Sequence, residues 1–148
     1  SEIFQPPNDI LMQSPSDFDE QALVLLIQDA SSGHSRYRAL LRRKLPSDCR
    51  SAFQKLSAVK ARQLQQLQRI CYLLTGDTLA VSSANTEPSR YILKELHTCA
   101  SAERQSYRHL MYTASHTDDP ELRSLCRSLA EEDMNCCRIL SSIVSKFI

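Results

Sequence analysis

Glycine is nearly absent from this chain, with two occurrences in 148 residues. A glycine-rich phosphate loop is therefore excluded, and no arrangement typical of a Ser/His/Asp hydrolase is recognisable. Strand-like alternation of apolar and polar residues is also missing. These absences favour an all-α protein, and the length suits one domain with its own core.

Excess charge and long apolar runs are lacking as well. The 18 basic residues nearly balance the 17 acidic ones, which leaves a net charge of +1. This balance gives no reason to expect binding to nucleic acid or to a charged membrane surface. Apolar runs such as residues 23–27 are far too short to cross a bilayer. We therefore expect neither nucleic acid nor a membrane as a partner.

Six cysteines are present, but none forms a CxxC or Cys/His zinc-binding spacing. Five of them fall within predicted helices and are interpreted as reduced core thiols, which favours a cytoplasmic location. A disulfide framework is the alternative. No secretory signal is recognisable, and whether a leader precedes Ser1 is left open. The cysteines are Cys49, Cys71, Cys99, Cys126, Cys136 and Cys137.

Four stretches keep apolar residues at alternating separations of three and four, the spacing of one helix face. Each is interrupted near its middle by polar or very small residues. Lys60, Gln63, Glu103 and Asp133 are consequently predicted to point into the core, where a charge needs a partner. The four stripes are Leu23, Leu26, Ala30, Gly33, Tyr37, Leu40; Phe53, Leu56, Lys60, Gln63, Leu67, Ile70, Leu74; Leu93, Leu96, Ala100, Glu103, Tyr107, Leu110; and Leu122, Cys126, Leu129, Asp133, Cys136, Leu140, Ile143, Phe147.

Capping signals set the expected helix ends. The expected starts are Ser16 or Asp17, Ser47 or Asp48, the residues after Pro88, and Asp118 or Asp119 with Pro120 in the first turn; Gly76 is the expected end of the second helix. Short loops make two antiparallel hairpins, and the linker of residues 77–87 can span roughly 40 Å when extended. The predicted fold is a four-helix bundle of residues 17–148, with a long crossover between its hairpins and an extended arm at residues 1–16.

Two phrases of the sequence, LSAVKARQLQQLQRICYLLTG and LAEEDMNCCRIL, resemble eroded metal-binding motifs of the ferritin-like superfamily, rubrerythrin branch. The resemblance covers about residues 17–148 and implies a ferritin-like bundle. In that family, two helices each supply one Glu and two others each supply a Glu-x-x-His pair to two metal ions. Carried over to this chain, the six ligand positions are Ala30, Lys60, Gln63, Ala100, Asp133 and Cys136.

The resemblance thus implies a degenerate metal site. Only Asp133 and Cys136 could still bind a metal at these positions, and the Lys60 ammonium would repel one, so no cofactor is expected. We hypothesise that Lys60 replaces the metal charge by pairing with Asp133 and Glu103; the alternative is that Lys60 extends through a loose core to solvent. Tyr37 and Tyr107 are expected at equivalent core positions, where their hydroxyls satisfy the polar layer.

Three functions remain open from the sequence. The leading hypothesis is a ferritin-like bundle that has lost its di-iron centre and serves, without catalysis, as an assembly or partner-binding protein, as a homodimer with an unknown protein partner. The second is an oxidoreductase or iron-handling protein with one iron or zinc ion. The third is a carrier of an apolar ligand, in a cavity left by small residues. The ligands of the second would be Glu103, Asp133, Cys136 and Asp29, and the small residues of the third are Ala30, Gly33 and Ala100.

Overall fold

Four α-helices make up the protein in this computed structural model, which describes the backbone of residues 6–79 and 87–148 and the side chains of residues 17–79 and 87–148. The helices are α1 (Pro6–Leu41), α2 (Ser47–Thr75), α3 (Ile92–His116) and α4 (Pro120–Ser145). No strand occurs in the described ranges, and the expected all-α four-helix bundle is confirmed.

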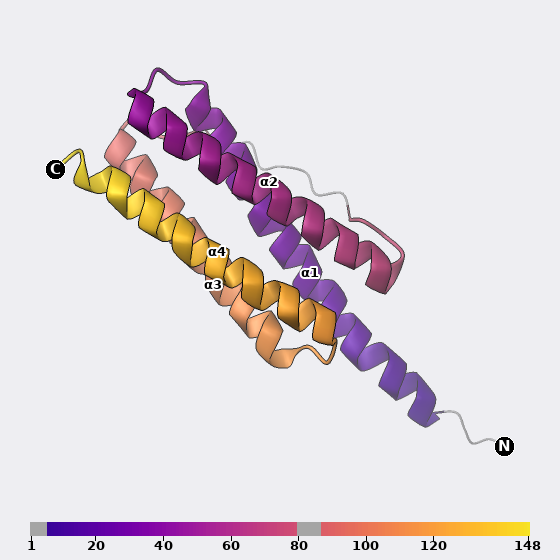
Figure 1. Cartoon of the computed structure of the whole chain (residues 1–148). Helices are drawn as coiled ribbons and strands as arrows, with labels where there is room; N and C mark the ends of the chain where they lie inside the picture. Colours follow the sequence, from indigo (N-terminus) through magenta and orange to yellow (C-terminus); the bar gives the residue numbers. More distant parts are fainter. Residues whose placement is uncertain (1–5, 80–86) are drawn as a thin grey trace.

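The helices form two antiparallel hairpins, α1 with α2 and α3 with α4 (Figure 1). Contacts of α1 with α3 and of α2 with α4 join the hairpins, so α1 and α4 lie on one diagonal of the bundle. Figure 1 shows α2 ending and α3 beginning at opposite ends of the bundle. The connection between them therefore spans the bundle, which confirms the predicted long crossover.

The start of α1 differs from the sequence-based expectation. The helix begins at Pro6 and so includes residues 6–16, for which an extended arm was expected. Pro6 and Pro7 lie in the first helical turn, where the missing N–H donors are not needed. At this end α1 reaches beyond the other helices (Figure 1). Residues 1–5 lie outside the described residues, and the division into an arm and a bundle domain stays a prediction.

The cap of α2 also differs from the expectation, although this helix begins at Ser47. Pro46 occupies the position before α2 and no side chain caps that helix, so the predicted caps Ser47 and Asp48 are wrong. α3 begins at Ile92, after Pro88 as expected, and the Arg43 guanidinium donates hydrogen bonds to the carbonyl oxygens of Ser89 and Arg90 just before this helix. These bonds tie the end of the crossover to the end of α1.

The remaining predicted boundaries are confirmed. Gly76 adopts a left-handed conformation with φ of 81°, and its N–H donates to the Tyr72 carbonyl at 2.8 Å. A side chain at this position would be strained, which explains one of the two glycines. Asp119 caps α4 by accepting a hydrogen bond from the Leu122 N–H at 2.8 Å, with Pro120 in the first turn.

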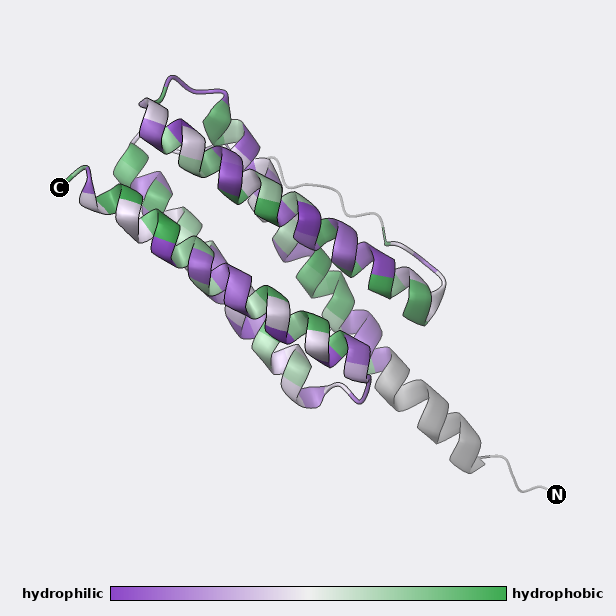
Figure 2. Cartoon of the chain, in the orientation of Figure 1, coloured by the Kyte–Doolittle hydropathy of each residue, from purple (hydrophilic) through white to green (hydrophobic). Residues whose placement is uncertain are grey.

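The core consists of two hydrophobic clusters, one toward each end of the bundle. The first includes Leu26, Leu67 and Leu129, and the second includes Phe53 and Leu140. Figure 2 shows hydrophilic and hydrophobic residues alternating along every helix rather than gathering in one segment. In agreement, none of the described helices contains a stretch long and apolar enough for a membrane span.

We predict that Asp119→Ala lowers the free energy of unfolding by about 1 kcal/mol, because the Leu122 N–H loses its capping acceptor. Asp118→Ala is the matched control, since it removes the same charge from an exposed neighbour at the same helix end. Urea titration of both variants measures the difference. Equal effects in the two variants would assign the loss to charge rather than to the cap.

Candidate functional site

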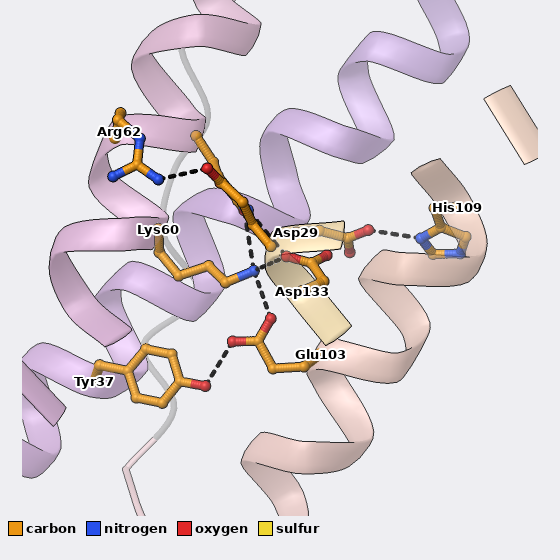
Figure 3. A network of polar contacts seen from close by, with 9 residues as sticks. Asp29, Tyr37, Lys60, Arg62, Glu103, His109 and Asp133 are labelled. Carbon is orange, nitrogen blue, oxygen red and sulfur yellow. Dashed lines mark hydrogen bonds and ion pairs between the residues drawn. The ribbon is translucent and has the colours of Figure 1, made fainter. Parts of the chain in front are cut away.

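The Lys60 ammonium lies between the two hydrophobic clusters, and the side chain is only 2 % exposed. Its Nζ atom is 2.5 Å from Glu103 Oε1, 2.8 Å from Asp133 Oδ1 and 3.0 Å from Gln63 Oε1. The ammonium donates hydrogen bonds to Gln63 and Asp133 and forms an ion pair with Glu103. Figure 3 shows the amino group between the two carboxylates. The predicted pairing of Lys60 with Asp133 and Glu103 is confirmed, and its predicted alternative, extension to solvent, is wrong.

Gly33 makes room for the Lys60 side chain. A Cβ atom at this position would lie 3.1 Å from Lys60 Cδ and 3.3 Å from Lys60 Cγ, tighter than an ordinary van der Waals contact. Because three contacts hold the ammonium in place, the aliphatic part of Lys60 has little freedom to move away. The small residue in the α1 stripe therefore accommodates the buried cation.

All four helices contribute to the polar layer. The Tyr37 hydroxyl of α1 donates to Glu103 Oε2 at 2.6 Å (Figure 3). The Gln63 amide of α2 donates to Asp133 Oδ1 at 3.0 Å. With Lys60, these bonds connect α2 to both α3 and α4 and connect α1 to α3. Asp133 Oδ2 and Glu103 Oε1 are buried without a hydrogen-bond partner among the described residues, and Glu103 Oε1 meets Lys60 Nζ as an ion pair.

The network reaches the surface between α2 and α4. The Gln63 amide also donates to Glu132 Oε1 at 3.1 Å, and the Arg62 guanidinium donates to Glu132 Oε2 at 2.6 Å. Sequence reasoning missed both Arg62 and Glu132. Each directly precedes a predicted layer residue in the sequence, Gln63 or Asp133. Their pairing with each other depends on how α2 packs against α4, which the spacing within one helix does not reveal.

Burial and charge shift the pKa values of the central pair differently. Burial raises the pKa of Glu103; Lys60 opposes this shift, and Asp133 adds to it. Burial acts to lower the pKa of Lys60, but Glu103 and Asp133 outweigh it and raise that pKa above its ordinary value of 10.5. One ammonium faces two carboxylates, so both stabilise the cation while each carboxylate also repels the other. Lys60 therefore stays protonated, and the pKa of Glu103 lies above that of a solvent-exposed glutamate.

Asp29, a proposed ligand of the alternative metal site, is paired with a histidine. Its Oδ2 atom lies 2.6 Å from His109 Nδ1, across α1 and α3, and both side chains are partly buried (Figure 3). Burial raises the pKa of Asp29, while the contact with His109 lowers it. The two residues lie 80 positions apart in the sequence, so their pairing depends on the packing of α1 against α3.

Tyr107 lies outside the hydrogen-bonded layer of the described residues. It is only partly buried, as is Ala100, whereas their neighbours Ser106 and Cys99 are buried. The predicted stripe is therefore right at Leu96, Glu103 and Leu110, whereas its intervening positions lie one residue earlier than predicted. The predicted and the observed stripes both repeat at three and four residues, so this spacing alone does not decide which side of Glu103 faces the core.

Cys136 occupies a core position beside the layer rather than a polar one. It is 1 % exposed and packs in the cluster with Tyr37 and Leu140. Burial, followed by the charge of Glu103, raises the pKa of its thiol. The protonated thiol is a poor metal ligand, since metals bind the thiolate. All six cysteines are free thiols.

Neither a metal cluster nor a large cavity is found at this layer. Within the described ranges, no group of three or more His, Cys, Asp or Glu side chains is arranged to hold a metal ion. The pocket that Gly33, Tyr37, Lys60 and Glu103 help to line has about 10 Å³. This is the space of a single water molecule and not of an apolar ligand.

Comparisons of the chain with protein-family models, curated proteins and solved structures find no match.

We predict that Lys60→Met lowers the free energy of unfolding by about 3–5 kcal/mol at neutral pH, because Glu103 and Asp133 lose their shared cation while buried. Lys55→Met, on an exposed face of the same helix, should change it by less than about 0.5 kcal/mol. Urea titration of each variant gives the values.

The triple variant Lys60→Met, Glu103→Leu, Asp133→Leu separates lost charge pairing from lost packing. It should recover most of the stability, because an apolar layer needs no cation. If Lys60→Met unfolds no more easily than Lys55→Met, the ammonium does not hold the layer together.

We predict that Glu103→Gln becomes more stable relative to the wild type as the pH rises from 4.5. The folded-state pKa of Glu103 lies above its ordinary value of 4.5, so the folded wild type binds more protons than the unfolded chain in this range. The contribution of Glu103 to wild-type stability is therefore lost as the pH rises through its folded-state pKa. Glutamine does not titrate, so the variant has no such loss. Urea titrations between pH 4 and pH 8 measure the difference, and a relative stability that falls over this range contradicts the prediction.

Proposed function

We propose that this chain is a non-catalytic helical bundle in which an ammonium stands where related bundles hold metal ions, and that it serves as an assembly or partner-binding protein. The observation that carries the proposal is the position of Lys60 Nζ, in contact with Gln63, Glu103 and Asp133. A bound dication would be repelled by this ammonium. The Lys60 ammonium, rather than a metal ion, balances the charge of the buried carboxylates and so stabilises the bundle.

The proposal includes loss of a di-iron centre from a ferritin-like ancestor. Support comes from the six positions carried over from that family, since Ala30 and Ala100 offer no ligand atom and Lys60 offers a cation. Gln63 and Asp133 already accept hydrogen bonds from Lys60. Too few free ligands remain for two metal ions.

The burial of the polar layer supports a role without catalysis. Lys60 and Glu103 are each 2 % exposed, and Asp133 is fully buried. An acid or base has to come within hydrogen-bonding distance of the reacting group, and a substrate outside the bundle cannot reach these side chains. We therefore place the function of the protein on its surface.

Large apolar side chains are available there for protein contacts. Leu25 is 41 % exposed, Tyr112 58 % and Met134 41 %. Exposed apolar groups that gather in patches are typical of protein interfaces. The expected homodimer, an additional protein partner and a cytoplasmic location all belong to this proposal.

The decisive experiment is elemental analysis of the full chain purified without chelators. We expect well under one iron or zinc ion per chain, because Lys60 occupies the centre of the carboxylate layer. Inductively coupled plasma mass spectrometry measures the metal content.

Asp133→Ala and Asp118→Ala provide the matched comparison. A stoichiometric ion in the wild type that is lost in Asp133→Ala and kept in Asp118→Ala would establish the single-ion alternative instead. Light scattering on the same preparation determines whether the chain is a homodimer.

A further inference from the structure

A groove of about 550 Å³ runs along the outside of the α3–α4 hairpin. Tyr107, Met111, Ala130 and Met134 supply its apolar lining. Met134 is 41 % exposed, and Tyr107 and Met111 are partly buried. Methionine side chains adapt readily to a bound apolar surface. The polar layer does not use these residues, so the groove is a separate feature of the molecule.

Two arginines border this groove, with a glutamate between them. Arg127, Glu131, Met134 and Arg138 follow one another at separations of four, three and four along α4, which places them on one stripe. Arg127 and Arg138 are thus three turns, or roughly 16 Å, apart. Both are exposed, and neither has an ion-pair partner among the described residues.

More positive charge lies on the neighbouring helix. Arg104 and Arg108 of α3 are exposed on the side that also carries Tyr107 and Met111, as their spacing of three and four residues requires. Together with Arg127 and Arg138, they exceed the single Glu131 by three positive charges, although the whole chain has a net charge of only +1. The positive charge is therefore concentrated around this groove.

We propose that the groove binds an acidic amphipathic helix of a partner protein. The inference rests on the proposed partner-binding function and adds the surface and the chemistry of the partner. An apolar groove between two helices suits the apolar face of a third, and the arginines favour carboxylates beside that face. A partner helix with two acidic residues eleven positions apart can face Arg127 and Arg138 together, with apolar residues between them on Met134.

Fluorescence anisotropy with a labelled helical peptide of about eighteen residues tests the proposal. The probe is alanine-based, with two glutamates eleven positions apart and leucines four and seven positions after the first. We expect it to bind the full chain, and Arg127→Glu with Arg138→Glu to raise the dissociation constant at least about tenfold. Met134→Ser should weaken binding by about fivefold through lost apolar contact. Arg69→Glu, at an exposed site on α2, is the matched control and should change the dissociation constant by less than about twofold.

A second peptide with lysines in place of the glutamates should show the opposite preference and bind the Arg127→Glu, Arg138→Glu variant more tightly than the wild type. Equal affinity of the wild type for the two peptides, or no binding of the glutamate peptide at millimolar concentration, overturns the proposal. Tighter binding of a single-stranded oligonucleotide, unchanged by Met134→Ser, also overturns it. These outcomes leave the metal analysis unaffected, so failure of this inference is distinguishable from failure of the proposed function.

Discussion

The structure depends on a buried ammonium that meets three oxygen atoms from three different side chains. Lys60 extends from α2 toward Glu103 of α3 and Asp133 of α4, and Gln63 completes the set. Because a buried cation is costly without partners, any displacement of α3 or α4 along the bundle would leave it uncompensated. The contacts therefore favour one register of the two hairpins. Two apolar clusters alone would fix that register less specifically.

The polar layer stabilises the interior of the bundle and is not exposed to a binding partner. Its charges are satisfied by one another and shielded from solvent, so they contribute to the fold and offer little to a substrate. The outer face of α3 and α4 has the opposite character, since its arginines have no ion-pair partners in the described part of the chain. Tyr107 illustrates the division: it lies on the groove rather than in the layer with Tyr37.

Local spacing predicted much of the fold and part of the site. The stripes through Leu56 and Leu129 correctly placed Lys60, Gln63 and Asp133 inward, because helix periodicity is a short-range property. The left-handed Gly76 and the Asp119 cap followed for the same reason. The start of α1, the partial exposure of Tyr107 and the exposed end of the fourth stripe at Phe147 were not foreseen, since they depend on where neighbouring helices provide cover.

The sequence by itself determined that the chain is helical and that polar or very small residues interrupt every apolar stripe, and it left open whether Lys60 pairs with carboxylates in the core or extends to solvent. Only the tertiary structure decided which groups meet. The pairs His109 with Asp29 and Gln63 with Glu132 join residues 80 and 69 positions apart, and the groove arises between two helices. The physical reason is that periodicity sets the direction of a side chain on its own helix, whereas the packing of helices sets the distance to its partner.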